Sequence, residues 1–215
     1  MSPAARRAGL QAGLVELGLE VPAAAVTLLM EYLDQLMHWN AAYNLTAVRD
    51  PDQAIARHLL DSLAIRRFVS GSVIDIGSGP GLPAIPLAIV APELAVTALD
   101  SNGTKARFLR HAVRTLGLPN VEVAEARAEA FQPGRTFDRV VSRAFSSLAD
   151  FFGKTVHLLA PGGEWVAMKG KLDGPEVAAV PPGYQIRETI RLQVPGLAEE
   201  RHVVIAIPSP ESSRK

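Results

Sequence analysis

Beyond residue 71, short β-branched runs alternate with helical segments, and this alternation restricts the possible folds more than any other feature. The runs expected as strands are residues 73–76, 96–99, 121–124, 139–142 and 165–168. Helical patterns near residues 82–90, 104–116 and 146–159 separate them. Strands that alternate with helices are typical of βαβ units and a mainly parallel sheet. The sequence therefore predicts an α/β fold.

Residues 1–70 follow a different, helical pattern. Apolar residues recur at helical spacing over 23–39, and a further helix is expected to begin at Asp50-Pro51. Asp50 would be its N-cap, Pro51 its first residue, and Gln53 would complete a variant of the capping box. A helical N-terminal region is therefore expected before the sheet.

The C-terminal part breaks the alternation. Residues 185–194 and 202–207 read as strands, and the connection around Pro195-Gly196 is too short for a helix. Such strands pair antiparallel, at an edge of the sheet. The expected organisation is a helical region at 1–70, an α/β domain at 71–208 and a flexible tail at 209–215.

Composition limits the chemistry. The 215 residues include no cysteine, which excludes disulfides, thiolate metal sites and a cysteine nucleophile. Lysine plus arginine and aspartate plus glutamate both number 22, and a net charge of zero argues, taken alone, against a nucleic-acid partner. No signal-peptide pattern and no uninterrupted apolar stretch long enough for a membrane is present. A cytoplasmic protein without membrane contact is expected.

The most informative local motif is the glycine loop Asp75-Ile76-Gly77-Ser78-Gly79-Pro80-Gly81-Leu82, which follows the first expected strand. Glycines allow a tight turn and a close approach of a ligand to the backbone. The third glycine comes one residue too early for a dinucleotide fingerprint, and no P-loop Gly-Lys-Ser/Thr follows. A plain turn is the alternative. The run resembles motif I of the class I S-adenosylmethionine-dependent methyltransferases, in which the leading acid, here Asp75, faces the amino-acid part of the cofactor.

A second acid, Asp100, ends the next expected strand. An acid at this position of a dinucleotide fold accepts hydrogen bonds from ribose hydroxyls. The alternative is that Asp100 or Ser101 serves as a helix N-cap. Two absences limit which atoms can accept the methyl group. There is no cysteine for attack at pyrimidine C5, and residues 137–144 contain and precede no Asn/Asp-Pro-Pro-aromatic loop of the kind used to methylate exocyclic amino groups.

Six further segments carry a more specific signal: Trp39-Asn40-Ala41-Ala42-Tyr43-Asn44-Leu45-Thr46, Arg57-His58-Leu59-Leu60-Asp61-Ser62, Gly79-Pro80-Gly81-Leu82-Pro83, Ser142-Arg143-Ala144-Phe145, Lys169-Gly170 and Glu200-Arg201-His202. Together they resemble the bacterial ribosomal RNA small subunit methyltransferase G family, also called glucose-inhibited division protein B. The resemblance implies a class I methyltransferase fold, S-adenosylmethionine as cofactor and methyl transfer to guanine N7 in 16S rRNA. Guanine N7 is an unprotonated acceptor, so no general base is required and catalysis rests on positioning.

The loop, Asp100 and this resemblance together assign candidate site residues. Those expected at the cofactor are Asp75, Gly77, Ser78, Gly79, Gly81, Leu82, Asp100, Ala128, Glu129 and Arg143. Those expected at the RNA are Arg57, His58, Arg127, Lys169 and Arg201. Arg143 is also expected to be catalytic, and no metal site is expected. The structural alternatives are a solvated Arg127–Glu129 pair, an edge-strand ion pair of Arg201, and capping or bridging between the two regions by Arg57 and His58.

The zero net charge conceals a local cluster. No acid lies between Asp100 and Glu122, whereas Arg107, Arg110 and Arg114 share one helical face near Lys105. A small basic patch and few phosphate contacts suit a structured ribosomal target. Trp39 and Tyr43, at i and i+4, are expected to pack within their helix rather than to stack on bases.

The expected partner is 16S rRNA, alone or in the small subunit or an assembly intermediate, and the expected state is a monomer. Two functions remain alternatives: a methyltransferase acting on a small molecule or protein, and a non-catalytic ribosome-binding protein that keeps a cofactor pocket.

Overall fold

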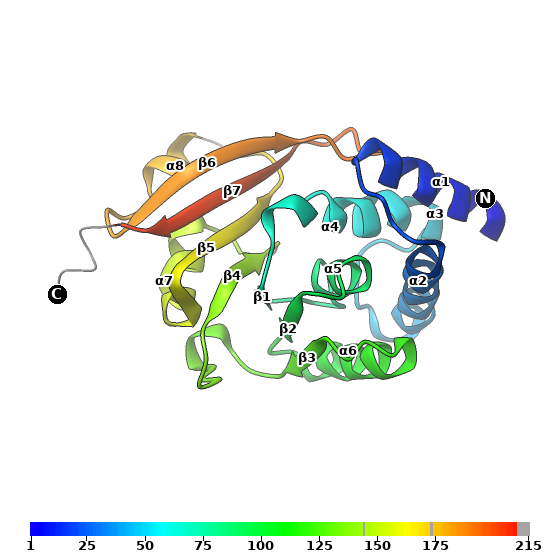
Figure 1. The fold of residues 1–215 in the computed structure, drawn as a ribbon, viewed down its shortest axis with the longest axis horizontal. Helices are drawn as coiled ribbons and strands as arrows, with labels where there is room; N and C mark the ends of the chain where they lie inside the picture. Colours follow the sequence, from blue (N-terminus) through cyan, green and yellow to red (C-terminus); the bar gives the residue numbers. More distant parts are fainter. Residues whose placement is uncertain (144, 173, 210–215) are drawn as a thin grey trace.

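The computed structural model describes residues 1–143, 145–172 and 174–209 (Figure 1). In these residues seven strands form one sheet in the order β3-β2-β1-β4-β5-β7-β6. The strands are β1 (Ser72–Ile76), β2 (Ala95–Leu99), β3 (Val121–Ala124), β4 (Phe137–Ser142), β5 (Leu159–Lys169), β6 (Tyr184–Leu192) and β7 (Arg201–Pro208). Strands β1 to β5 pair in parallel, and β7 pairs antiparallel with both β5 and β6. The predicted α/β fold with an antiparallel edge is confirmed.

Helices cover both faces of this sheet (Figure 1). Outside the segment that follows Asp50, the α-helices among the described residues are α1 (Pro3–Glu16), α2 (Ala23–Tyr43), α5 (Ala84–Val90), α6 (Gly103–Leu116), α7 (Leu148–Thr155) and α8 (Gly174–Ala178). Successive residues of β1 alternate between the two sides: Val73 joins the cluster under α2, α5 and α6, whereas Ile74 and Ile76 join the cluster under α7. Burial on both faces explains why the central strands β1 and β2 read as nearly continuous apolar runs.

Some element limits differ from the sequence expectation. The helix expected over 146–159 ends at Thr155, and a 3-10 turn, η4 (Val156–Leu158), leads into a longer β5. Helix α8 was not expected, because none of its residues is buried and its sequence therefore carries no apolar stripe. Of the expected tail, only Ser209 lies within the described residues.

The start at Asp50 is confirmed. Asp50 caps α3 (Pro51–Ala54) by accepting a hydrogen bond from Asp52 N at 2.9 Å. Gln53 contacts Asp50 through the two side chains at 3.3 Å, and no bond from Gln53 to the Asp50 N–H occurs among the described residues, so the expected capping box is not formed. The helix continues through a π-helical segment, η1 (Ile55–Leu60), into α4 (Asp61–Leu63).

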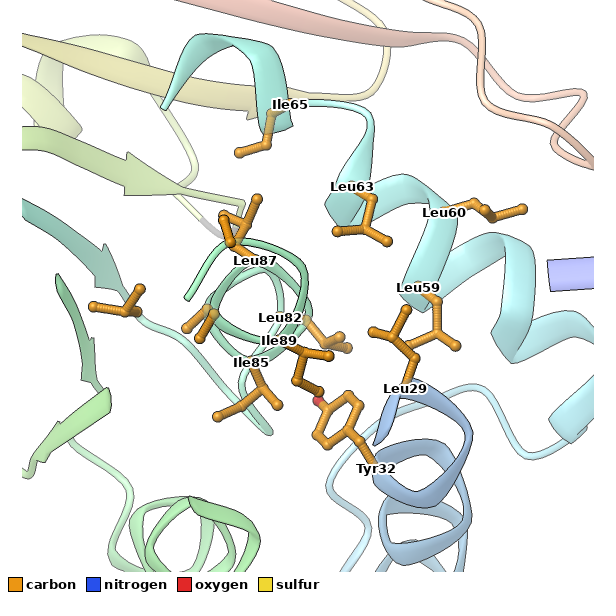
Figure 2. Packing of buried hydrophobic residues seen from close by; sticks show 14 of the residues in the cluster. Leu29, Tyr32, Leu59, Leu60, Leu63, Ile65, Leu82, Ile85, Leu87 and Ile89 are labelled. Carbon is orange, nitrogen blue, oxygen red and sulfur yellow. The ribbon is translucent and has the colours of Figure 1, made fainter. Parts of the chain in front are cut away.

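The N-terminal helices share a hydrophobic core with the sheet region. Leu29 and Tyr32 of α2 lie between Leu59 of η1 and the side chains of α5, as Figure 2 shows. Trp39 packs its ring against Tyr43 in the same helix, with ring centroids 5.3 Å apart, as predicted, and also against Phe108 of α6 at 5.5 Å. The division at residue 70 stays a prediction. In the described ranges, no helix is both long and apolar enough to cross a membrane.

Candidate active site

The carboxyl ends of the parallel strands carry both cavities of interest. The order of the strands reverses between β1 and β4, and ligands of open α/β sheets bind beside such a switch point. One cavity, of about 290 Å³, lies at the ends of β1, β2 and β3. The other, of about 380 Å³, lies at the ends of β4 and β5 and the start of β7.

The first of these, the glycine-loop cavity, is lined by Ile76, Gly77, Leu99, Asp100, Ser101, Lys105, Ala126, Arg127, Ala128, Glu129, Phe145 and Lys154. It brings together the predicted cofactor residues Gly77, Asp100, Ala128 and Glu129. Arg127 was expected at the RNA, but the structure places it here, beside Glu129. Lys105 and Lys154 were not assigned from the sequence, since single lysines on helix surfaces give no specific signal.

The glycine loop owes its shape to its own backbone, and long-range hydrogen bonds hold it in place. Gly77 has φ +68°, and Gly81 has φ +105° with so little space that a Cβ there would lie 2.4 Å from Ile85 Cγ1. Both positions therefore require glycine. The buried hydroxyl of Tyr32, in α2, donates to Pro80 O at 2.9 Å and ties the loop to the N-terminal region.

Asp75 lies beneath this loop and is fully buried. Its Oδ2 accepts hydrogen bonds from Ser78 Oγ at 2.6 Å and from Ala84 N at 3.2 Å. Burial raises the pKa of Asp75 to about 6, against the opposing effect of the Ser78 bond. Its Oδ1 is buried and has no hydrogen-bond partner among the described residues. A buried, unpartnered carboxylate oxygen is costly and favours a bound donor or cation.

Asp100 supports the loop from the neighbouring strand. Its Oδ2 accepts from Gly79 N and its Oδ1 from Asn102 N, both at 2.8 Å. Asn102 is the N-cap of α6, since its side chain accepts from the next backbone amides, so the N-cap alternative for Asp100 or Ser101 is wrong. A carboxylate offers about four lone-pair sites, and Asp100 can therefore accept further bonds.

The remaining loop residues shape the site without lining its cavity. Ser78 is buried against Asp75, and Leu82 lies in the core between α2 and α5 (Figure 2). Gly79 contributes its N–H to Asp100.

The second cavity, the arginine pocket, is lined by Val48, Arg57, His58, Asp61, Arg143, Met168, Lys169, Gly170, Leu192, Arg201 and His202. It gathers Arg143 and four of the five residues predicted to bind RNA. They come from segments that lie far apart in the chain: η1, the ends of β4 and β5, and the start of β7. Of the six segments that carried the family resemblance, four contribute residues to this pocket.

Asp61 is the site residue that the sequence interpretation missed. Its carboxylate, 3% exposed, accepts from Arg201 Nε at 3.0 Å and lies 3.5 Å from Arg143 Nη1. Arg201 thus forms an ion pair, as one alternative proposed, but across to α4 rather than along the sheet edge. The signal was present, since Asp61 lies four residues after Arg57 in a segment already singled out.

The other cations of the arginine pocket are also paired. Arg57 forms an ion pair with Glu199, in the connection between β6 and β7. Lys169 Nζ lies 2.7 Å from Glu176 Oε1 in α8 and donates to Phe145 O at 3.2 Å. This pairing explains how a cation-rich pocket coexists with a net charge of zero.

His58 is buried at the wall of the arginine pocket. Its Nε2 lies 2.9 Å from Thr46 Oγ1, and its Nδ1 has no partner within the described part of the chain. Burial, with the Arg143 charge, lowers the pKa of His58 to about 4, so the ring is neutral near neutral pH. No group of three or more metal-ligating side chains occurs among the described residues.

The predicted basic face of α6 is present but partly neutralised. Arg107, Arg110 and Arg114 are exposed, and Arg110 forms an ion pair with Glu125 at 3.0 Å. Lys105, in the first turn of the same helix, lines the glycine-loop cavity. The patch therefore borders that cavity rather than the arginine pocket.

The strand order and the glycine-loop cavity define a class I S-adenosylmethionine-dependent methyltransferase. Solved structures share this fold: a methyltransferase of Aquifex aeolicus has a TM-score of 0.59 at 17% identity, covering 76% of this chain and 97% of its own. TrmN of Thermus thermophilus has a TM-score of 0.57 at 20% identity over 72% of this chain and 53% of its own. At these identities the likeness shows the fold alone.

The chain belongs to the rRNA small subunit methyltransferase G family. The family model matches residues 25–204. Ribosomal RNA small subunit methyltransferase G of Stenotrophomonas maltophilia is 52% identical over 94% of this chain and 95% of its own, and that of Laribacter hongkongensis is 51% identical over 91% and 95%. The resemblance seen in the sequence is confirmed, and with it S-adenosylmethionine as the cofactor.

Proposed function

We propose that this enzyme transfers a methyl group from S-adenosylmethionine to N7 of a guanine in 16S ribosomal RNA, with the nucleotide held in the arginine pocket. The observation that carries the proposal is the adjacency of the two cavities. Arg143 lines the arginine pocket, and Phe145, two residues further, lines the glycine-loop cavity. The printed name of the curated relatives supports ribosomal RNA of the small subunit as the substrate.

The residues of the glycine-loop cavity fit the cofactor. Oδ1 of Asp75 offers an acceptor for an ammonium group, and the remaining lone pairs of Asp100 suit ribose hydroxyls. Ala128 and Glu129 would border the adenine, with Gly77 beneath the ligand. Ser78, Gly79, Gly81 and Leu82 would act by shaping the loop. When bound, S-adenosylmethionine supplies an electrophilic methyl group on a cationic sulfonium.

The chain's own contribution to the reaction is positioning. Guanine N7 carries a lone pair and no proton, so none of these residues has to remove one. Arg143, Arg201 and Lys169 can donate hydrogen bonds to base and phosphate oxygens and fix the base in line with the methyl group. Neutral His58 adds no positive charge beside a purine that becomes cationic, and Asp61 provides a compensating negative charge.

We further propose that the enzyme works as a cytoplasmic monomer on RNA presented by the small subunit or an assembly intermediate. Support for a structured RNA target comes from the pairing of each cation of the arginine pocket with an acid. Such a surface neutralises few phosphates of an arbitrary strand and favours a structured target.

The test uses small subunits and naked 16S rRNA from cells that lack this enzyme, incubated with labelled S-adenosylmethionine. Nuclease digestion and mass spectrometry should find the label in 7-methylguanosine at one site. Label in another nucleotide, in ribosomal protein only, or in no product despite calorimetric binding of the cofactor would overturn the proposal.

A further inference from the structure

The arginine pocket is organised around one buried carboxylate. Asp61 contacts Arg143, which follows β4, and Arg201, which begins β7. Among the described residues that line this pocket, Asp61 alone carries a carboxylate. Two guanidinium groups from distant parts of the chain therefore share a single counter-charge.

The helix that carries the Asp61 carboxylate is anchored in the hydrophobic core. Leu59, Leu60 and Leu63, on either side of it in the helix, are buried in the core, as Figure 2 shows from close by. The Asp61 N–H bonds to Ala56 O, the i to i+5 spacing of a π-helix. Such local widening of a helix is frequent at functional sites, and here it places Arg57, His58 and Asp61 on one pocket.

We propose that Asp61 is a positioning residue that fixes the orientation of Arg143 and Arg201 toward the methyl-accepting nucleotide, an inference that rests on the proposed function. A free arginine side chain samples many rotamers, and fixing it on the substrate costs conformational entropy. Asp61 fixes both guanidiniums before the nucleotide binds. Because a displacement of about 1 Å of reacting groups can lower a rate about 100-fold, this orientation matters for turnover.

The proposal separates turnover from binding. Asp61→Asn leaves a side chain of nearly the same size but removes the shared counter-charge, so the two guanidiniums repel each other and lose their fixed orientation. The pocket also becomes more positive, which favours RNA. Turnover should therefore fall while affinity for RNA stays the same or increases, and a mere loss of folding would lower both.

Glu164, in β5, provides a matched control. Its carboxylate, 18% exposed, also bridges two arginines, with Arg139 at 3.2 Å and Arg187 at 2.7 Å. It lines neither the glycine-loop cavity nor the arginine pocket. Glu164→Gln removes an equivalent bridge at a distance from the proposed chemistry.

The experiment measures, for the full-length wild type and both variants, kcat on small-subunit RNA, the Kd for that RNA, the calorimetric Kd for S-adenosylhomocysteine and the Tm. We expect Asp61→Asn to lower kcat at least about ten-fold, with RNA affinity kept or increased and ligand affinity within about two-fold. Glu164→Gln should keep kcat within about two-fold. Wild-type kcat in Asp61→Asn, or a parallel loss of RNA affinity, overturns the proposal.

Asp61→Glu covers the case in which Asp61→Asn does not fold. It keeps the charge but moves the carboxylate by one methylene, so a positioning role predicts a several-fold lower kcat at unchanged ligand affinity, and wild-type kcat overturns it. All ratios refer to the product that the wild type forms. A wild type that methylates RNA elsewhere than guanine N7 overturns the proposed function alone, and one that methylates no RNA overturns both.

Discussion

The two cavities at the carboxyl edge of the sheet are built in opposite ways. The glycine-loop cavity rests mainly on backbone: positive φ angles at Gly77 and Gly81 and a hydrogen bond from the Gly79 N–H to Asp100. The arginine pocket rests on side chains that reach one point from four separate segments. The comparison teaches that the glycine-loop cavity should lose its ligand when a side chain fills the space beside its backbone. The arginine pocket should instead lose function when one member of an ion pair is removed.

The strongest expected effect is on the backbone-built cavity. Gly77→Asp adds a side chain and a negative charge where the loop approaches the cofactor, and we expect a loss of affinity for S-adenosylmethionine of about 1,000-fold, or about 4 kcal/mol, by calorimetry. Gly117→Asp is the control, because Gly117 has a similar φ of +63° at the end of α6 and open space around it. Unchanged affinity in a folded Gly77→Asp protein would refute the cavity assignment.

The side-chain-built pocket should lose activity without losing the cofactor. Arg143→Ala is expected to lower kcat about 100-fold, or about 2.7 kcal/mol, with a smaller effect on stability. Arg139→Ala serves as control, since Arg139 lies at the other end of β4 and donates to Phe68 O at 3.2 Å. Methyl-transfer kinetics and thermal unfolding are compared, and a proportionate loss of both in Arg143→Ala would indicate a structural role.

A lower pH should change the contributions of the two cavities to folding stability in opposite directions. The pKa of His58 is lowered to about 4 in the folded chain, against 6.5 in the unfolded chain. Between these two pH values the unfolded chain binds a proton at His58 and the folded chain does not, so the free energy of unfolding decreases as the pH falls below 6.5. His58→Gln should remove this loss. Between about pH 7 and about pH 5, the free energy of unfolding of the variant, measured with urea, should rise by about 2 kcal/mol relative to that of the wild type.

Asp75 is the counterpart beneath the glycine loop. Its pKa is raised to about 6 by burial, so the folded chain takes up the proton first and gains stability as the pH falls from above 6 toward the unfolded value of 3.8. Asp75→Asn should therefore lose stability relative to the wild type over the same pH interval. Changes of the same sign in the two variants would contradict the contrast between the cavities.

The smallest effect concerns the charge balance of the arginine pocket. Glu199→Gln frees Arg57 from its acidic partner. Because exposed ion pairs are weak, we expect binding of unrelated RNA to tighten only about two- to four-fold, more at about 50 mM than at about 200 mM salt in filter binding. Glu93→Gln, which breaks the exposed pair with Arg66 away from both cavities, should change nothing. Equal effects of the two variants would rule out a role for Glu199 in selecting RNA.

The sequence predicted the glycine loop well, because such a motif is local. Three glycines directly after a buried strand specify a turn whatever the rest of the chain does. The helix start at Asp50 and the packing of Trp39 were predicted for the same reason, since a cap and an i, i+4 pair involve neighbours in the chain.

Two placements depended on contacts between distant parts of the chain. The sequence left Asp100 open between a ligand role and an N-cap role; Asn102 takes the N-cap role, and Asp100 accepts a hydrogen bond from Gly79 N. Arg127, predicted at the RNA, lines the glycine-loop cavity rather than the arginine pocket, because β3 lies on the other side of β1 from β4, which Arg143 follows; its contact with RNA stays a prediction. Long-range pairing decided both positions, and no local pattern encodes it.

The sequence by itself determined the alternation of strands and helices, the antiparallel edge, the glycine loop and the family, because periodicity and short motifs depend on nearby residues. Only the tertiary structure decided that Asp61 joins Arg143 and Arg201, residues up to 140 positions away, in one pocket. Charged side chains find partners through space rather than along the chain. The net charge of zero, which first argued against a nucleic-acid partner, is at this site the sum of cations and the acids that pair with them.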